Sequence, residues 1–469
     1  MFANQTTSVF GFSHALFHKA LYDSLFAEER MLLHRQCFEI LKTEWDALAK
    51  TQEQTLPLAS KLLLHAERSD ELEVAADIAL TAAHGAWRTY AEAEALEMLG
   101  HVKRFVTNSE YDFTEKKRDE LLGEALLLRS QIDRMRGRFD DALNECTSSF
   151  EHFERLNDKK KATSSLNERA NVLYRQGAYE LSESEARKAL MMAKDANYKL
   201  GETHALNTIG NVNDACGAYD EALEYHTRCL AVNESIGDRS GIAISLNNIG
   251  NVHRNRGAFG EALDYYNKSL KMQESIGNRY GIALVLNNVG GVYQHQGASD
   301  IALDYYSRSL KLFESIGDRL GIAGTLHNIG SAHADRGTHD KALEYYKQSL
   351  EMCESAGNQY GVVLALVNIG VTHREQGDLS NVRQFLERAR TLAAEIKMKH
   401  FEATAWCELG VLSEAEAEQY EGDATRKTAK MREAMAYLEK GVGILHEINN
   451  NTMEGYEREL ERLKAENSE

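Results

Sequence analysis

Seven glycines spaced forty residues apart constrain the fold of this chain more than any other feature. They are Gly137, Gly177, Gly217, Gly257, Gly297, Gly337 and Gly377. Because only 33 of the 469 residues are glycine, six repetitions at one offset would arise by chance about once in ten million trials. A period of this size is typical of a stacked repeat array, so the chain is predicted to be a solenoid with a long surface for binding.

Each repeat unit is predicted to be a hairpin of two helices. In residues 245–284 the first helix has an apolar stripe at helical spacing, formed by Leu246, Ile249, Gly250 and His253. The second stripe comprises Phe259, Ala262, Leu263, Tyr266 and Leu270. Gly257 lies between the stripes, where the chain has to turn. Gly250 recurs at 210, 290, 330 and 370, which suggests that the two helices approach closely there.

These residues resemble the tetratricopeptide repeat. The positions that carry the resemblance are Leu246, Ile249-Gly250, His253, Gly257-x-Phe259, Ala262 and Tyr266. The repeat here has 40 residues in place of the common 34, lacks the terminal proline and inserts an IGDR-x-GIA linker. Longer repeats of this type look like those of Pins-type polarity adaptors and many bacterial signalling proteins. The resemblance covers about residues 123–410 and implies an all-α, right-handed α-solenoid of about seven hairpins.

Residues 1–45 resemble a different family. The pattern Phe10, Phe12, His14-Ala15-Leu16, Ala20-Leu21-Tyr22, Arg30 and Leu33-His34 is similar to the junction between the ATPase module and the repeat arm of bacterial signal-transduction ATPases. That resemblance implies that the chain is part of a larger protein or a stand-alone descendant. The sequence contains no Gly-x-x-x-x-Gly-Lys-Ser/Thr phosphate loop, so the ATPase itself is not expected in this chain.

The expected organisation has four parts. Residues 1–45 form the helical junction segment, and residues 46–122 form degenerate helical repeats that end in a charged loop over 106–122. Residues 123–410 form the repeat array, and residues 411–469 form a charged helical cap. The single proline, Pro57, leaves nearly every segment free to be helical.

Composition limits the classes of partner. The net charge of −18 disfavours binding to nucleic acid, whose phosphates repel an acidic protein. Six scattered cysteines without a Cys-x-x-Cys pair suggest a reduced compartment. No apolar run approaches 18 residues. The expected protein is cytoplasmic and does not bind membranes.

A polar stripe on the first helices is the candidate binding site. Asparagines follow the apolar leucine of successive repeats, and further polar residues lie four and seven positions later on the same stripe. The set comprises Asn167, Asn171, Asn207, Asn211, Asp214, Asn247, Asn251, Arg254, Asn287, Gln294 and His327. The resemblance to Pins-type adaptors implies that such amides hold the backbone of a peptide in the concave groove. The alternative is that duplication copied them and that they bond between adjacent repeats.

Other recurring polar residues have structural interpretations. The set Asn248, Asn288, Asn328 and Asn368 is expected mainly to link repeats, and Arg239, Arg279 and Arg319 to pair with local Asp and Glu. His253, His333 and His373 occupy the aromatic core position of the repeat. His14 and His18 have metal-ligand spacing but no third ligand, so no metal or other cofactor is expected.

The predicted function is non-catalytic. The leading hypothesis is a scaffold or sensor arm of a signalling protein, which binds a protein or peptide segment, including an intramolecular or ATPase-domain partner. One alternative is a sensor arm for a small-molecule inducer, and another is a self-assembly module. No Ser-His-Asp or Cys-His arrangement has a supporting context, so the chain is not expected to be an enzyme.

Overall fold

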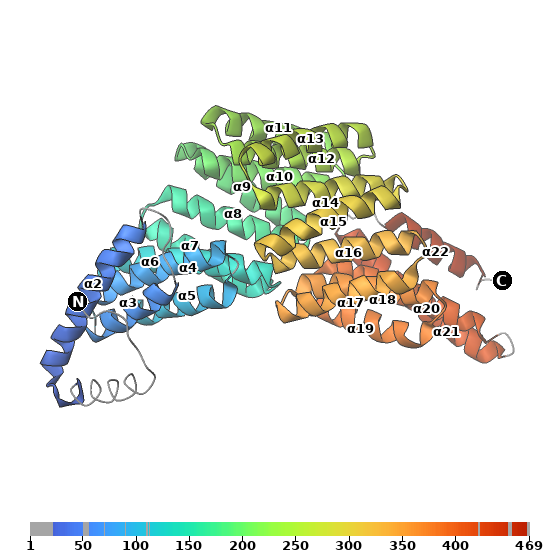
Figure 1. Ribbon diagram of the computed structural model, residues 1–469. Helices are drawn as coiled ribbons and strands as arrows, with labels where there is room; N and C mark the ends of the chain where they lie inside the picture. The colour runs from blue at the N-terminus through green and yellow to red at the C-terminus, as the bar shows by residue number, and fades with distance from the viewer. Residues whose placement is uncertain are drawn as a thin grey trace. The chain divides into compact units, whose positions relative to one another are not determined.

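The computed structural model describes residues 22–49, 56–69, 71–89, 91–108, 111, 113–420, 423–448 and 453–466. Within these residues the secondary structure is helix and turn, with no strand, so the predicted all-α class is confirmed (Figure 1). The chain divides into two compact units, Met1–Leu128 and Arg129–Glu469. The boundary lies inside helix α6 (Glu115–Met135).

Unit 1 is a small stack of consecutive helices. They are α2 (Ala27–Ala49), α3 (Leu56–Arg68), α4 (Leu72–Arg88), α5 (Glu92–Val106) and the first part of α6. Helix α2 contacts α3, α3 contacts α4, and α4 contacts α5. Residues 115–122, predicted to belong to a charged loop, instead form the first turns of α6, where Leu121 is buried together with Ala125 and Leu128 further along the helix. Much of the segment compared with the ATPase junction, up to residue 21, lies outside the described residues.

Unit 2 consists of helix hairpins stacked in chain order (Figure 1). After α7 (Phe139–Arg155) they are α8 (Lys159–Gln176) with α9 (Tyr179–Asp195), α10 (Lys199–Ala215) with α11 (Tyr219–Ile236), α12 (Arg239–Asn255) with α13 (Phe259–Ser275), α14 (Arg279–His295) with α15 (Ser299–Ile316), α16 (Arg319–Asp335) with α17 (His339–Ser355), α18 (Gln359–Glu375) with α19 (Leu379–Glu395) and α20 (Lys399–Glu418) with α21 (Ala424–Glu447), followed by α22 (Met453–Glu466).

The glycine ladder supplies the turn inside each hairpin. Its seven members all have φ between 70° and 80°, a left-handed conformation that costs glycine little. A second ladder, again forty residues apart, ends the second helix of each hairpin. Gly237, Gly277, Gly317 and Gly357 occupy it in the central repeats, and Asn157, Asn197 and Lys397 take the same left-handed conformation at its ends. Local conformation therefore repeats with the sequence period.

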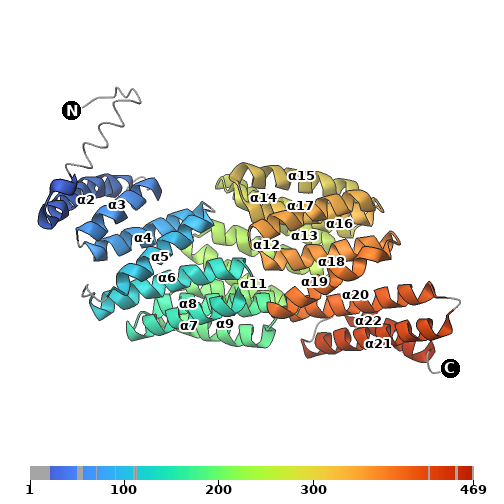
Figure 2. The ribbon, with the colours of Figure 1, turned by 90° about the horizontal axis from the view of Figure 1, so that it is seen from below.

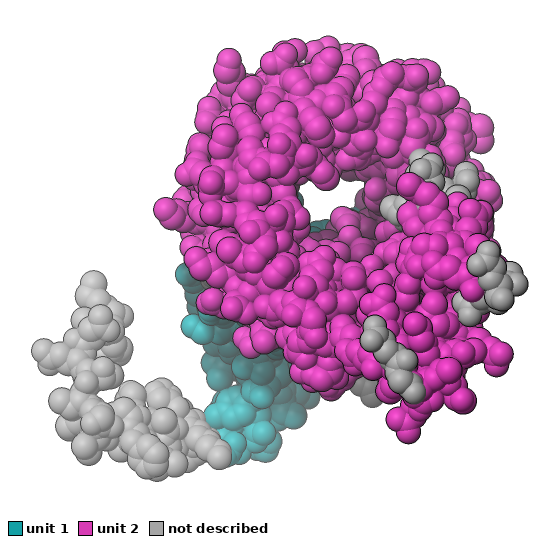
Figure 3. Space-filling model, turned by 90° about the vertical axis from the view of Figure 1, so that its right-hand side faces the viewer, with its two compact units in different colours: residues 1–128 teal, residues 129–469 magenta. Residues whose placement is uncertain are grey.

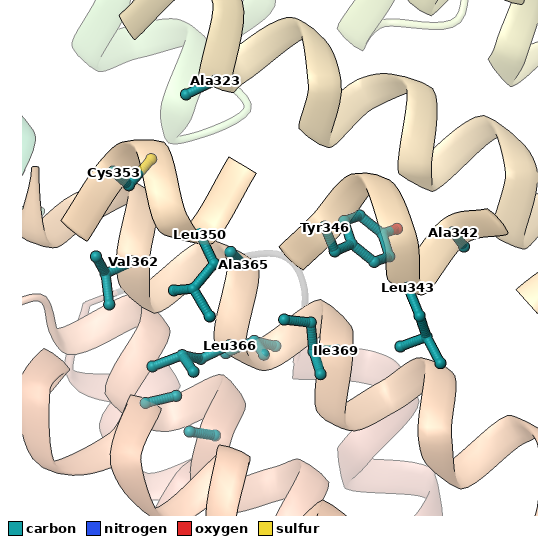
Figure 4. Packing of buried hydrophobic residues seen from close by; sticks show 13 residues of the cluster. Ala323, Ala342, Leu343, Tyr346, Leu350, Cys353, Val362, Ala365, Leu366 and Ile369 are labelled. Atoms are coloured by element: carbon teal, nitrogen blue, oxygen red, sulfur yellow. The ribbon is translucent and has the colours of Figure 1, made fainter. Parts of the chain in front are cut away.

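The glycines inside the first helices mark close helix–helix contacts, as predicted. A Cβ atom added to Gly250, Gly290 or Gly330 would lie 2.7–2.8 Å from the ring of Tyr266, Tyr306 or Tyr346 on the partner helix. These tyrosines are buried (Figure 4 shows Tyr346 in one such cluster). In each of these hairpins a tyrosine ring on the second helix therefore packs directly against the backbone of the first helix.

The first helix of each hairpin lies on the inner side of the curved stack. Adjacent first helices contact one another along the array, from α8 with α10 through to α18 with α20. The second helices instead contact the first helices of their own and the next hairpin. Figure 2 shows the stacked hairpins from below. Elements on the concave side of a curved stack converge, so the first helices form the inner wall.

Unit 2 also closes on itself and leaves an opening (Figure 3). The backbone N–H of Gln359 in α18 donates to the carbonyl of Arg136, 3.3 Å away, before α7. One apolar cluster joins the start of the array to its α18–α19 hairpin. It comprises Phe139, Ala142 and Cys146 from α7 and Val172 from α8, together with Val363, Ala393, Ile396 and Met398 from the region of α18 and α19. We call this contact the seam. It turns the repeat array into a ring.

The arginines of the repeat linkers have other partners than the sequence predicted. Arg239, Arg279 and Arg319 do not pair with local carboxylates; each donates through Nη2 to a serine hydroxyl 36 residues later, at 2.7–2.8 Å. The serines are Ser275, Ser315 and Ser355, one at the end of the second helix of each hairpin. The sequence pattern did not reveal this contact because the partner of each arginine is an uncharged serine at the end of the second helix.

Candidate binding site in the central opening

A single stripe along each first helix faces the opening. In α10 it runs through Leu200, His204, Asn207, Asn211 and Asp214, at offsets of 4, 7, 11 and 14 residues. Because adjacent first helices are in contact, these stripes lie side by side on the inner wall. The same positions in α12 and α14 therefore continue each row from one repeat to the next.

Helices α8 and α18, which meet at the seam, also interact through their side chains. The guanidinium of Arg175 in α8 lies 5.9 Å from the ring centroid of Tyr360 in α18. Burial raises the pKa of Tyr280 in α14, the carboxylate of Asp318 adds to this, and Arg175 opposes it. Tyr280 remains 39% exposed. First helices from three parts of the array thus converge on the opening.

The half of the stripe near the start of each first helix carries exposed apolar side chains. Leu200 is 42% exposed, Ile244 48%, Tyr280 39% and Leu284 38%. They occupy the first two positions of the stripe in neighbouring repeats, Leu200 and Tyr280 the first and Ile244 and Leu284 the second. We call these four residues the apolar row. A monomeric protein seldom aligns several large apolar side chains on a concave wall unless they bind something.

The asparagines form a second row, and their amides are bonded to one another. Asn248 donates to Asn207 Oδ1 at 2.6 Å, Asn288 to Asn247 at 2.9 Å and Asn328 to Asn287 at 3.2 Å. In the next repeat Asn368 Nδ2 lies 2.9 Å from His327 Nε2. Both asparagine sets thus belong to one ladder across the repeats. The interpretation that the amides bond between adjacent repeats matches these contacts, and each bonded amide retains capacity for a further partner.

The remaining predicted residues are also held by neighbours. Asn167 is buried and donates to the carbonyl of Gly201 at 3.0 Å, and Asn171 accepts from Thr208 at 3.1 Å. Asn251 accepts from the hydroxyl of Tyr266 at 2.7 Å. Asn211, four residues after Asn207, is partly exposed on the same stripe. Buried Asn167 is therefore removed from direct contact with a ligand, whereas Asn211 is accessible.

Charged residues follow the asparagines at the far end of the stripe. Asp214 accepts from Asn255 at 2.8 Å, and burial raises its pKa. Arg254 donates to Asn255 Oδ1 at 3.2 Å. Gln294 donates to Ser331 and Asp335 at 2.9 and 2.6 Å and accepts from Tyr306 at 2.7 Å. The first helices α10, α12 and α14 therefore each present an apolar residue, an amide and a charged or amide group in order.

Sequence reasoning found the amide row and missed the apolar row. Ile244 and Leu284 directly follow the IGDR-x-GIA linker and precede the first leucine of the predicted apolar stripe, and no role was predicted for them. The available signal was their spacing of three residues before Asn247 and Asn287, which places them on the same helical face. The expected packing role of the repeat histidines is confirmed, since His253 and His333 stack on Tyr265 and Tyr345 at 5.3 and 5.5 Å between ring centroids.

Metal and membrane sites were searched among the described residues. There, no group of three or more His, Cys, Asp or Glu side chains is arranged to hold a metal ion. His14 and His18 lie outside that part of the chain. None of the described helices combines the length and the apolar character that crossing a bilayer requires.

Comparison with known proteins identifies the repeats. The tetratricopeptide repeat family model matches residues 202–275, 281–355 and 321–395. No curated protein matches the sequence.

Solved structures share the fold at low sequence identity. A Rap protein complexed with competence and sporulation factor is 15% identical, covers 77% of this chain and 98% of its own, and superposes with a TM-score of 0.55. A Rap conjugation gene regulator in complex with the Phr* peptide is 14% identical, covers 73% and 94%, and has a TM-score of 0.51. A signal-transduction ATPase with a tetratricopeptide repeat sensor from Pyrococcus horikoshii is 16% identical, covers 95% and 67%, and has a TM-score of 0.49. The chain therefore contains an array of tetratricopeptide repeats.

Proposed function

We propose that the central opening of unit 2 binds an extended peptide segment of a partner protein, and that the chain acts as a non-catalytic sensor or scaffold. The observation that carries the proposal is the apolar row beside the asparagine row on one concave wall. Apolar side chains of the peptide would contact Ile244 and Leu284, while its backbone would bond to amides that keep spare donors and acceptors. An extended peptide presents both kinds of group along its length.

The solved structures support this proposal through their fold. Two of them superpose with TM-scores above 0.5, and these two proteins are in complex with competence and sporulation factor and with the Phr* peptide. At 14–15% identity they carry no information about individual contacts in this chain. The chemistry of the bound segment is therefore argued from the inner wall alone.

Peptide selection followed by site-directed variants tests the proposal. Peptides would be selected from a random library displayed on phage, using the purified chain as bait, and their Kd measured by fluorescence anisotropy. We expect Ile244→Ser combined with Leu284→Ser to raise the Kd at least tenfold, since each lost apolar contact contributes about 1 kcal/mol or more.

The matched control lies on the outer side of the same ring. Leu181 and Met191 on the second helix α9 are 62% and 65% exposed, so Leu181→Ser combined with Met191→Ser removes similar apolar surface away from the opening. Wild-type affinity in this control supports the site. The proposal would be contradicted if both double variants weakened peptide binding equally. It would also be contradicted if the substitutions at Ile244 and Leu284 left the affinity unchanged.

A further inference from the structure

One arginine at the inner wall has no ionic partner. Arg175 is exposed and stands in the last turn of helix α8. The other arginine of α8, Arg169, is paired with Glu185. In contrast, no carboxylate oxygen among the described residues lies within 4.0 Å of the Arg175 guanidinium. The dipole of α8 favours a cation in its last turn, so the folded array tolerates this charge without an ion pair.

The surroundings of Arg175 are aromatic. Its guanidinium carbon lies over the ring of Tyr360 in α18, 5.9 Å from the ring centroid. Burial raises the pKa of Tyr280 in α14, and the charge of Arg175 opposes this rise, which places the two groups near one another. Tyr280 belongs to the apolar row and is 39% exposed. The guanidinium therefore lies beside the surface along which the peptide is proposed to bind.

The repeat does not explain the positive charge at this position. The later first helices have, at the same place, Ala215, Asn255, His295, Asp335 and Glu375. Because alanine, amide, imidazole and carboxylate side chains all occupy the position within one fold, packing does not require an arginine there. Among these residues only Arg175 carries a permanent positive charge.

We propose that the peptide bound in the central opening carries a carboxylate that pairs with Arg175, next to an apolar side chain that contacts Tyr280. The proposal rests on the proposed peptide-binding function and names the chemistry of its ligand. The carboxylate belongs either to an Asp or Glu side chain or to the C-terminus of the peptide.

The chemistry of the guanidinium favours this ligand. A tyrosine ring neutralises none of the charge, so the N–H donors of Arg175 can bind both oxygens of a carboxylate. The chain has a net charge of −18, which repels an acidic peptide at long range. Screening limits that repulsion to about 8 Å at physiological ionic strength, so the contact with Arg175 decides the preference.

Peptide selection supplies the first test. The library has peptides with free C-termini, and the wild-type chain and Arg175→Glu serve as separate baits. We expect the wild type to enrich peptides in which Asp, Glu or the C-terminus lies beside an apolar residue, relative to the unselected library. The reversed charge of Arg175→Glu should enrich Lys or Arg in their place.

Synthetic versions of one selected peptide then locate the carboxylate. They are the unchanged peptide, one with its acidic side chains replaced by amides, and one with an amidated C-terminus. Arg175→Gln should raise the Kd of the unchanged peptide about tenfold and have little effect on the version that lacks the bonded carboxylate. Arg175→Lys, which keeps the charge without the planar fork, should recover part of the affinity.

The matched control is another arginine that lies over a tyrosine ring. Arg228 on the second helix α11 is 5.1 Å from the centroid of Tyr225, away from the inner wall. Arg228→Gln should bind all three peptides like the wild type, and circular dichroism should show every variant folded. The peptide substitutions are also measured on the wild-type chain, so the test does not depend on the folding of any variant.

Failure of this proposal can be told apart from failure of the peptide site. The carboxylate pairing is overturned if Arg175→Gln binds every peptide as tightly as the wild type while Ile244→Ser combined with Leu284→Ser loses affinity; the peptide site then stands. It is also overturned if Arg228→Gln weakens binding as much as Arg175→Gln. If the wild type selects no peptide at all, both proposals are wrong.

Discussion

Lys397 and Asp140 form an ion pair across 257 residues of sequence, with Nζ 2.9 and 2.7 Å from the two carboxylate oxygens. The lysine stands in the left-handed conformation, with φ of 58°. At the equivalent positions of the other repeats, glycine or asparagine occupies this conformation. Lys397 is therefore a strained residue whose side chain reaches across the seam.

The Lys397→Gly variant compares two contributions to stability, the strain of the left-handed conformation and the ion pair with Asp140. Relief of the left-handed strain should contribute about 1 kcal/mol, while loss of a pair whose side chains are 61% and 57% exposed should cost about 0–1 kcal/mol. We expect a stability within about 1 kcal/mol of the wild type by urea denaturation, together with faster hydrogen exchange at the seam. Asn197→Gly is the control, because it has the same backbone geometry and no partner across the seam. A loss well above 1 kcal/mol would show that the ion pair contributes more than an exposed pair should.

Gly290→Ala should destabilise the array although alanine is the better helix former. The new Cβ would lie 2.7 Å from the ring of Tyr306, and overpacking of this kind costs about 1–3 kcal/mol against a gain of about 1 kcal/mol in helix propensity. Gly324→Ala is the control, because no atom lies within 4 Å of its added Cβ. It should be neutral or stabilising in the same urea titration. Equal effects of the two substitutions would contradict the close contact.

The repeat fold followed from the sequence because each hairpin is specified locally. Glycines at fixed spacing set the turns, and apolar residues at helical spacing set the packing face, so one repeat predicts the next. The seam could not be predicted in this way. Curvature accumulates from a small rotation at every interface between repeats, and no residue in one hairpin encodes the sum. Only afterwards do Lys397 and Arg175 stand out as departures from the repeat.

The candidate site was predictable in part for the same reason. Their spacing placed Asn247 and Asn287 on one helical face, but the contact of Asn247 with Asn288 depends on how neighbouring repeats stack. Exposure of Ile244 was hidden because a solvent-facing and a buried isoleucine look alike in sequence. Periodicity reveals which residues share a face, whereas the partner of that face is set by tertiary geometry.

A buried acidic pair predicts one dependence of stability on pH. Burial and the nearby Asp133 carboxylate raise the pKa of Glu145 to about 8, although Arg129 Nε lies 2.8 Å away and opposes this. Folding therefore takes up a proton between the unfolded pKa, about 4.5, and about 8. Stability should fall as pH rises through that window and level off above it.

Glu145→Gln isolates this effect. The glutamine cannot ionise, so the difference in unfolding free energy between variant and wild type should shift in favour of the variant by on the order of 1 kcal/mol from pH 5.5 to 8. Glu151→Gln, an exposed position on the same helix α7, should show no such trend. If the difference in unfolding free energy between Glu145→Gln and the wild type does not change with pH, Glu145 is ionised in the folded protein at neutral pH.

His327 replaces an asparagine of the ladder and should make its repeat sensitive to acid. Burial lowers its pKa to about 4, and its ring lies 5.1 Å from that of Tyr346. The unfolded histidine takes up a proton near pH 6.5, whereas the folded one resists until about pH 4, so stability should fall as pH drops through this window. His327→Asn would restore the amide pair of the preceding repeats, in which Asn328 donates to Asn287. Between pH 7 and 5 we expect the unfolding free energy of this variant, measured by urea denaturation, to fall by about 1–2 kcal/mol less than that of the wild type. The control is His295→Asn at an exposed position, which should follow the wild type. If His327→Asn is as acid-sensitive as the wild type, the ladder histidine is charged within the folded array and its bond to Asn368 must be reassigned.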